Sequence, residues 1–124
     1  MSFVPDSFVS QLPNVSRGAA DAQPFGVVQV DDSGVIQLYN KWESEMAAVP
    51  VPSAEGRNFF TQVAPCTNNR LVFGKFKDGV AKGELDSEFN YTFTYKMKPT
   101  NVQIRLMHHA ASKTNWVLVG MRAA

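Results

Sequence analysis

The sequence has little of several features that would place it in a class directly. Its 124 residues include one cysteine, which excludes an internal disulfide and predicts a reducing compartment. Lys and Arg number 12 against 11 Asp and Glu, and this near balance gives no indication of a nucleic-acid or membrane-surface partner. No apolar run approaches the roughly 20 residues that span a bilayer, and the start lacks the basic and apolar segments of a secretion signal. We therefore expect a soluble cytoplasmic protein.

The residues that are present predict a packed core in one domain. Hydrophobic residues make up 44% of the chain and charged residues 19%, which is typical of a folded protein. A chain of 124 residues fits one domain of ordinary size. Residues 1–23 are irregular in pattern, so we interpret them as an N-terminal cap on a globular unit over 24–124.

The first part of the chain predicts short elements separated by turns and prolines. In order, these are a short helix from Pro5 that Pro13 stops, a loop over 16–21, strands over 25–30 and 35–39 around a turn at 31–34, and a helix over 41–48 that Asn40 caps and the prolines at 50 and 52 end.

The second part predicts one longer helix and three strands. Val72, Phe73, Phe76 and Val80 share one face of a helix over 70–82, and Gly83 is placed to stop it. Apolar and polar residues then alternate with a period of two, as in strands with one buried face. These strands are predicted over 89–97, 102–106 and 116–121, with turns at 98–100 and 112–115.

This order of elements predicts an α+β fold with one five-stranded antiparallel sheet and helices on one face. The PAS fold has the same order, and its sheet and covering helices enclose a small cavity. The fold alone does not determine the function.

The stretch over 56–67 is the most informative part of the sequence because it holds Cys66, the single cysteine. Pro65 restricts the backbone before it, which helps to aim the sulfur in a defined direction. A lone cysteine in an apolar stretch is more often a small packed side chain than a reactive group. Spacing alone therefore favours a packing role.

A resemblance to a known family changes that interpretation. The stretch over 56–67 resembles the chromophore-attachment region of the photoactive yellow protein family. The segments 38–40 with Glu43, 73–76 with Gly79-Val80, and 91–100 are also similar to that family, in register from about Pro24 to the last strand. The first twenty or so residues match poorly.

The resemblance implies a blue-light photoreceptor, not an enzyme, with p-coumaric acid (4-hydroxycinnamic acid) bound to Cys66 as a thioester. Tyr39 and Glu43 would hydrogen-bond the phenolate oxygen, and light would isomerise the double bond from trans to cis. Met97 would assist the thermal return. The other residues implied to form the pocket are Val28, Ala47, Val49, Phe59, Val63, Ala64, Pro65, Thr67, Tyr91 and Phe93.

Physical chemistry supports these residue types independently. A phenol has a pKa of about 10, and burial raises it, so a buried phenolate needs hydrogen-bond donors. A tyrosine hydroxyl supplies one donor, and a glutamic acid supplies another if burial keeps it protonated. Transfer of the Glu43 proton would leave a buried carboxylate, whose cost of several kcal/mol is enough to loosen part of the domain.

Each of these residues also has an alternative role. Asn40 and Glu43 have the spacing of a helix capping box, and Met97 continues the apolar face of its strand. His108 and His109 could suggest a metal site or a base for Cys66, but neighbouring strand residues point to opposite faces. We expect no metal. The alternative functions are a PAS domain that binds another small ligand or a protein, and an enzyme with Cys66 as nucleophile.

The sequence departs from the family at two positions. Ala47 stands where the family usually has a threonine bonded to the tyrosine, and Val49 stands where its type protein has an arginine over the chromophore. We expect colour to be retained, with a different absorption maximum and photocycle rate. The expected partners are the chromophore and an unknown signalling protein, and the expected state is a monomer or weak homodimer.

Overall fold

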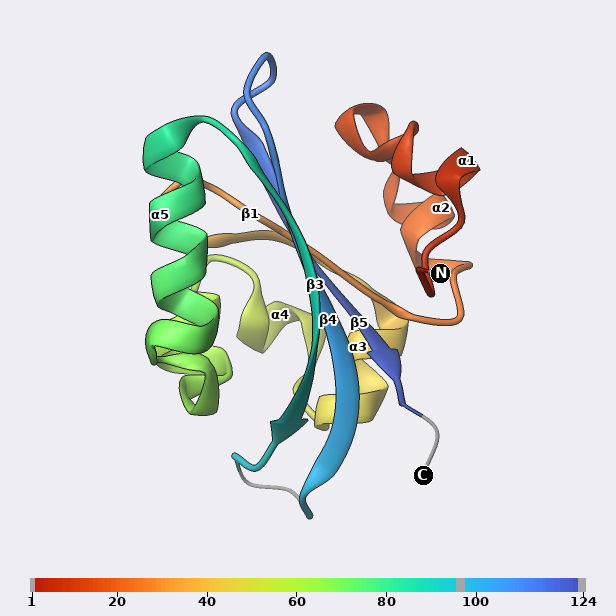
Figure 1. Ribbon diagram of the computed structural model, residues 1–124. Coiled ribbons are helices and arrows are strands. Elements are labelled where there is room, and N and C mark those ends of the chain that lie inside the picture. Colours follow the sequence, from red (N-terminus) through yellow and green to blue (C-terminus); the bar gives the residue numbers. More distant parts are fainter. Residues whose placement is uncertain (1, 96–97, 123–124) are drawn as a thin grey trace.

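A five-stranded antiparallel sheet forms the centre of the computed structural model, which describes residues 2–95 and 98–122. The strands are β1 (Gly26–Val30), β2 (Ile36–Tyr39), β3 (Leu85–Phe93), β4 (Thr100–His109) and β5 (Thr114–Met121). They lie in the order β2-β1-β5-β4-β3, so the first and last strands of the chain are neighbours (Figure 1). The predicted α+β class and five-stranded antiparallel sheet are confirmed.

The helices are short apart from α5. They are α1 (Asp6–Val9), η1 (Leu12–Asn14), α2 (Arg17–Asp21), α3 (Lys41–Ala47), α4 (Val51–Ala54), η2 (Phe59–Val63), η3 (Pro65–Thr67), η4 (Arg70–Gly74) and α5 (Lys75–Lys82). The helix predicted over 70–82 is confirmed as a wide turn, η4, that continues into α5. Gly83 ends it in the left-handed conformation, at φ 71°.

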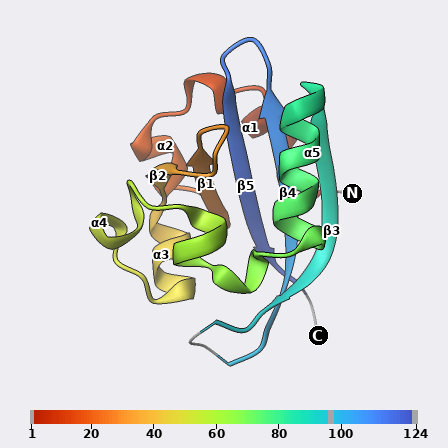
Figure 2. The same ribbon diagram turned by 90° about the vertical axis from the view of Figure 1, so that its left-hand side faces the viewer.

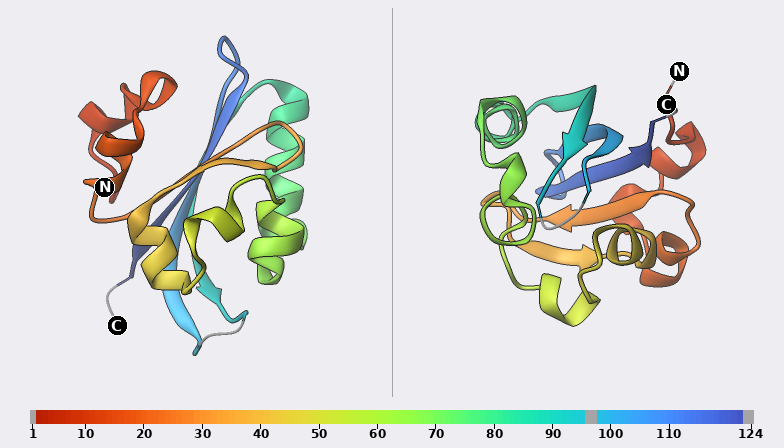
Figure 3. Two further views of the ribbon diagram at one scale, coloured as in Figure 1. Left: turned by 180° about the vertical axis from the view of Figure 1, so that it is seen from behind. Right: turned by 90° about the horizontal axis from the view of Figure 1, so that it is seen from below.

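Helices cover both faces of the sheet, which corrects the prediction that they lie on one face. In Figures 1 and 2, α3, α4 and α5 lie on one side, and the N-terminal helices α1 and α2 lie on the other. Figure 3 shows the same layers from behind and from below. Two buried clusters result, one under α5 that includes Phe60 and Phe76, and one under the N-terminal segment that includes Phe8 and Trp116.

The central strands explain why the sheet needs two covers. Val27 and Val28 are neighbours in β1, so their side chains point to opposite faces, and both are fully buried. The same holds for Val117 and Leu118 in β5. Continuous apolar runs of this kind are typical of strands that are covered on both faces. The apolar runs in β1 and β5 therefore indicate, from the sequence alone, that helices cover both faces of the sheet.

The N-terminal segment contains a helix where a loop was predicted. The prediction of a loop over 16–21 was wrong, because the small and polar residues of this segment are also typical of a linker. Ser16 caps the helix instead, since its Oγ accepts a hydrogen bond from the N–H of Ala19 at 3.1 Å. This cap and the burial of Ala20 fix α2 against the rest of the chain.

Strand boundaries also differ from the prediction. β3 begins at Leu85, four residues early, because it pairs with β4 as far as His108. It ends at Phe93, whereas alternation suggested Met97, which lies outside the described residues. β4 and β5 are likewise longer than predicted, because hydrogen bonding between them continues through polar residues to the turn at 110–113.

Candidate functional site

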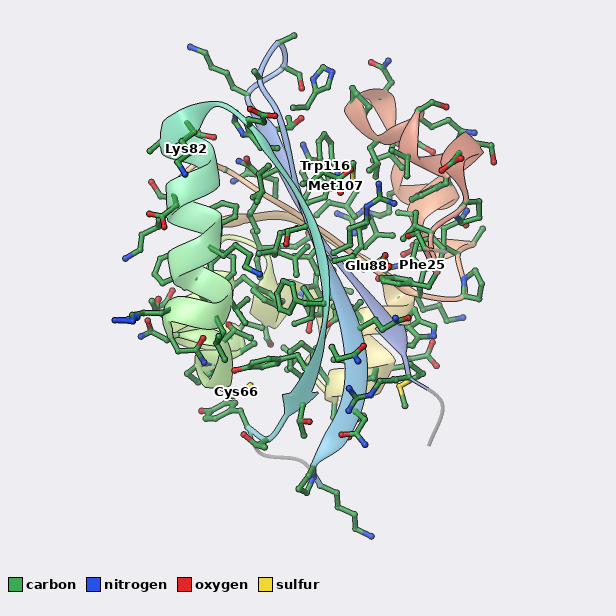
Figure 4. All side chains as sticks on the ribbon, viewed as in Figure 1. Phe25, Cys66, Lys82, Glu88, Met107 and Trp116 are labelled. Carbon is green, nitrogen blue, oxygen red and sulfur yellow. The ribbon has the colours of Figure 1, made fainter. Side chains whose placement is uncertain are left out.

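A cavity of about 260 Å³ lies between α3, the segment that leads to Cys66, and the end of β3. This is close to the lower end of the 300–1,000 Å³ typical of small-molecule sites. Figure 4 shows Cys66 on the α5 side of the sheet, away from Phe25 and Trp116 of the N-terminal cluster. The residues that line the cavity are Tyr39, Glu43, Ala47, Ala48, Val49, Val63, Ala64, Cys66, Phe93 and Tyr95.

Most of the side chains predicted for the site meet around this cavity. Sequence reasoning missed Ala48 and Tyr95, which also line it. Ala48 is a turn residue that gave no signal, whereas Tyr95 continues the alternating face of Tyr91 and Phe93, which could have indicated it. Met97 lies outside the described residues. The predicted pocket residues that do not line the cavity are Val28, Phe59, Pro65, Thr67 and Tyr91.

The residues that do not line the cavity support it from behind. Val28 and Phe59 are fully buried in the core beneath it. Thr67 is fully buried, and its hydroxyl donates a 2.6 Å hydrogen bond to the carbonyl of Ala64. Whether these side chains touch a bound molecule stays a prediction.

Tyr39 and Glu43 are the polar centre of the cavity. Tyr39 ends β2 and Glu43 lies in the first turn of α3, and their exposed fractions are 0% and 1%. In the part of the chain that the structure describes, three buried polar side-chain atoms have no hydrogen-bond partner. Two of them are Tyr39 Oη and Glu43 Oε1, and the third is Trp116 Nε1 in the other cluster. Buried polar groups normally have partners, so this pair is suited to a ligand that accepts hydrogen bonds.

Burial determines the protonation of both groups. Desolvation raises the pKa of Glu43 to about 8, so its carboxyl group is mostly protonated at neutral pH. Desolvation, and secondly the negative charge of an ionised Glu43, raise the pKa of Tyr39 far above its ordinary value. At pH 7 the cavity therefore presents two neutral O–H groups, each able to donate a hydrogen bond.

The local backbone explains why Glu43 points into the cavity. Asn40 Oδ1 accepts the N–H of Glu43 at 3.1 Å and so caps α3. In a capping box the glutamate would return to the N–H of Asn40, but that N–H bonds the carbonyl of Val27 at 3.1 Å. The capping alternative for the Glu43 side chain is therefore wrong. Gly26 provides the space for the Glu43 carboxyl group, because a Cβ at position 26 would overlap Glu43 Oε1.

Asn40 also connects this site to the N-terminal segment. Its Nδ2 donates to the carbonyl oxygens of Ala20 at 2.8 Å and Phe25 at 2.9 Å. Its Oδ1 also accepts the N–H of Val27 at 2.9 Å. This fully buried amide therefore joins α2, β1 and the start of α3 in one hydrogen-bond network.

Cys66 lies in η3 with a half-buried, free thiol. Its main-chain carbonyl is held from two sides. Tyr91 Oη donates to it at 2.5 Å and Asn69 Nδ2 at 3.2 Å, and Asn69 Nδ2 also donates to Tyr91 Oη at 2.7 Å. Asn69 Oδ1 meanwhile accepts the N–H groups of Leu71 and Val72. The segment that holds Cys66 is thus fixed to β3 and to η4.

The described residues that line the cavity include no cation. Ala48 adopts the left-handed conformation, with φ 56° and ψ 39°, and turns the chain from α3 to Val49. Ser44 holds that turn, because its Oγ donates to the carbonyl of Val49 at 2.6 Å. An anion bound here would depend on the hydroxyl of Tyr39 and the carboxyl of Glu43.

The two histidines lie elsewhere. His108 and His109 end β4, and both line a second cavity against Leu12 and Trp116 on the N-terminal face of the sheet, which corrects the expectation that neighbouring strand residues could not share one site. No histidine is among the described residues around Cys66, so the structure offers that thiol no imidazole base. Within residues 2–95 and 98–122, no group of three or more His, Cys, Asp or Glu side chains could hold a metal ion. None of the helices described is both long and apolar enough to cross a membrane.

Comparisons with known proteins agree with this geometry. No family model matches the sequence. Photoactive yellow protein from Halochromatium salexigens is 37% identical over 117 residues, or 94% of each chain. The solved photoactive yellow protein domain of the sensor histidine kinase Ppr from Rhodospirillum centenum is 41% identical, with a TM-score of 0.83 over 89% of this chain and 96% of that one.

More distant structures identify the fold. The PAS domain of Bordetella pertussis BvgS is 14% identical, with a TM-score of 0.67 over 97% of this chain and 88% of that one. A likeness at such low identity shows the fold alone, and it confirms the predicted PAS fold. The 37% identity over nearly the full length of both chains goes further and shows that this chain belongs to the photoactive yellow protein family.

Proposed function

We propose that this PAS-fold sensor of the photoactive yellow protein family is a blue-light receptor that carries p-coumaric acid on Cys66 as a thioester. The observation that carries the proposal is the joint placement of a free thiol and two unpartnered buried O–H groups around one cavity. A packed cysteine would need neither hydroxyl nor acid beside it. Coincidence of all three is difficult to explain by core packing.

The residues present fit such a group. Bound as a thioester, p-coumaric acid would supply absorption of blue light and a double bond that light isomerises from trans to cis. Phe93 and Val63 provide apolar surface for a flat aromatic ring, and Tyr39 and Glu43 provide donors for the oxygen at its far end. The main chain of Cys66, fixed by Tyr91 and Asn69, gives the sulfur a stable position.

Tyr39 and Glu43 would keep a buried phenolate charged. Burial disfavours that anion, and charge-assisted hydrogen bonds from two O–H donors offset the loss of water. The pKa of Glu43, near 8, keeps its donor proton in place at neutral pH. Because this pKa is close to neutral pH, Glu43 can also release its proton when an adjacent acceptor becomes more basic.

Release of that proton would make Glu43 the trigger of a conformational change. The resulting carboxylate would lie in a site where it is 1% exposed, with no cation among the described lining residues. An isolated buried charge costs several kcal/mol, against a total stability of about 5–15 kcal/mol for a typical domain. The strain would act on the start of α3 and, through Asn40, on α2. An unidentified signalling protein that detects this movement is the proposed partner.

Reconstitution tests the proposal. The purified apoprotein is mixed with activated p-coumaric acid, and its mass and visible spectrum are recorded before and after illumination. We expect one covalent adduct on Cys66, a yellow colour that bleaches in light and returns in darkness, and neither adduct nor colour with Cys66→Ala. A free thiol and a colourless protein after reconstitution would contradict the proposal. Tight reversible binding of a small ligand by Cys66→Ala would instead support a PAS ligand-binding domain without covalent colour.

A further inference from the structure

We propose that Glu55 is a positioning residue for Tyr39, and that Arg17 of the N-terminal segment holds Glu55 in place. The inference deepens the proposed function, because it concerns the residue that would donate a hydrogen bond to the chromophore. The placement of the Tyr39 backbone determines the direction in which its side chain points.

Tyr39 lies on the outer strand of the sheet. β2 pairs with β1 on one side, and the strand order leaves its other side without a strand. The next residue, Asn40, donates its N–H to the carbonyl of Val27 in β1. Since successive N–H groups along a strand point to opposite sides, the N–H of Tyr39 points away from β1. Because Tyr39 is fully buried, its outward N–H needs a hydrogen-bond partner.

Glu55 supplies that partner. Its Oε2 accepts the N–H of Tyr39 at 2.9 Å, 16 residues away in sequence. The following residues complete the edge, because Gly56 donates its N–H to the carbonyl of Ile36, and the N–H of Ile36 bonds the carbonyl of Arg57. The segment over 55–57 therefore replaces a sixth strand, and at Tyr39 the acceptor is a carboxylate in place of a main-chain carbonyl.

The same carboxylate oxygen binds a cation from the N-terminal segment. Arg17 Nη2 lies 2.6 Å from Glu55 Oε2, and the two side chains are 49% and 26% exposed. Arg17 is the first residue of α2, the helix whose Ala20 carbonyl is bonded by Asn40. One carboxylate thus connects α2 with the backbone of Tyr39. Because this ion pair is partly exposed, salt should weaken it. The equilibrium for local opening at Tyr39 should then shift by about two- to fivefold toward the open state.

The experiment first uses the apoprotein, so that it does not depend on the chromophore. Amide hydrogen exchange of Tyr39 and the NMR shift of its ring carbon next to the hydroxyl are measured at low salt and in 1 M salt, roughly a 3 Å screening length. Glu55→Ala removes the acceptor, Glu55→Gln keeps an acceptor without charge, and Arg17→Gln removes the cation. Arg57→Gln is the matched control, since the guanidinium of Arg57 lies in the same segment and donates a hydrogen bond to the carbonyl of Ser53.

We expect Glu55→Ala to accelerate Tyr39 amide exchange about tenfold or more and to move the ring signal, as the loss of a hydrogen bond to a charged group implies. Glu55→Gln should have a smaller effect. Arg17→Gln should accelerate exchange about two- to fivefold at low salt and should abolish the salt dependence. Arg57→Gln should behave as the wild type. Unchanged exchange in Glu55→Ala, or unchanged salt dependence in Arg17→Gln, would overturn the proposal.

The reconstituted protein then shows whether the effect reaches the chromophore. Glu55→Ala should shift the absorption maximum and change the dark recovery rate, whereas Arg57→Gln should not. Faster Tyr39 exchange with an unchanged ring signal and an unchanged spectrum would mean that Glu55 only covers the strand edge, which would overturn its positioning role. A wild-type protein that stays colourless would contradict the proposed function, while the apoprotein signals would still decide the role of Glu55.

Discussion

Glu43→Gln should change how the stability of the apoprotein depends on pH. The pKa of Glu43 is about 8 in the folded chain, against 4.5 as the ordinary value that applies when the chain is unfolded. Between these values the folded state holds a proton that the unfolded state has lost. Raising the pH from about 4.5 therefore reduces stability by up to about 1.4 kcal/mol per pH unit, until the loss levels off above about pH 8.

The size of the effect makes it measurable. The full change is on the order of 5 kcal/mol, a large part of the 5–15 kcal/mol of a typical domain. Glutamine keeps the shape of the protonated acid and does not titrate, so the variant should match the wild type near pH 4.5 and exceed it by several kcal/mol above pH 8. Burial is the sole cause of the shift, so the difference should not depend strongly on salt.

Urea unfolding followed by tryptophan fluorescence between pH 4.5 and 9 would provide the free energies of unfolding. Glu45→Gln is the matched control, because Glu45 lies two residues further along α3 and is exposed. Its profile should follow the wild type. Parallel profiles for wild type and Glu43→Gln would refute the reasoning, since they would mean that Glu43 ionises in the folded chain as easily as in the unfolded one.

Five further substitutions, at four positions, test the walls of the cavity and the residue behind Glu43. Gly26→Ala should displace the carboxyl of Glu43 and destabilise the apoprotein by ~1–3 kcal/mol, and after reconstitution it should shift the absorption maximum; an unchanged spectrum would contradict the close approach. Ala48→Gly should stabilise the protein in thermal melts by about 1 kcal/mol, since the φ of 56° at Ala48 suits glycine. Ala47→Gly, at the last residue of α3, should destabilise it by up to about 1 kcal/mol, and equal signs for the two substitutions would contradict this. Ala47→Thr and Val49→Arg should each move the absorption maximum or the dark recovery rate of the reconstituted protein, and if both leave spectrum and kinetics unchanged, the roles assigned to these two wall positions are wrong.

Local patterns in the sequence predicted most of the elements that carry the site. Asn40 before a short helix and Gly83 after a long one are signals that a few neighbouring residues determine, and both ends are where they were expected. The alternation in the last three strands predicted their existence, but their ends depend on pairing between distant residues. For that reason β3 extends back to Leu85, which no local pattern indicated.

The site was predictable only in part, because its polar groups depend on contacts that spacing does not show. The capping alternative for Glu43 was reasonable until the N–H of Asn40 was found to bond Val27. The bond between Glu55 and the backbone of Tyr39 joins residues that are 16 positions apart, and neither type suggests the other. Cys66 itself was ambiguous as a lone cysteine in an apolar stretch, and the resemblance of its segment to a known motif, more than the local pattern, indicated a candidate site.

The proposed light response depends on Glu43, a buried and neutral acid that we propose gives up its proton after illumination. The infrared difference spectrum between illuminated and dark reconstituted protein tests it most directly, because a protonated carboxyl has a carbonyl stretch that a carboxylate lacks. We expect a carbonyl band that is present in the dark, disappears in the light and is missing from Glu43→Gln in both states. A dark protein without this band, or a light-induced loss of the same band in Glu43→Gln, would contradict the account.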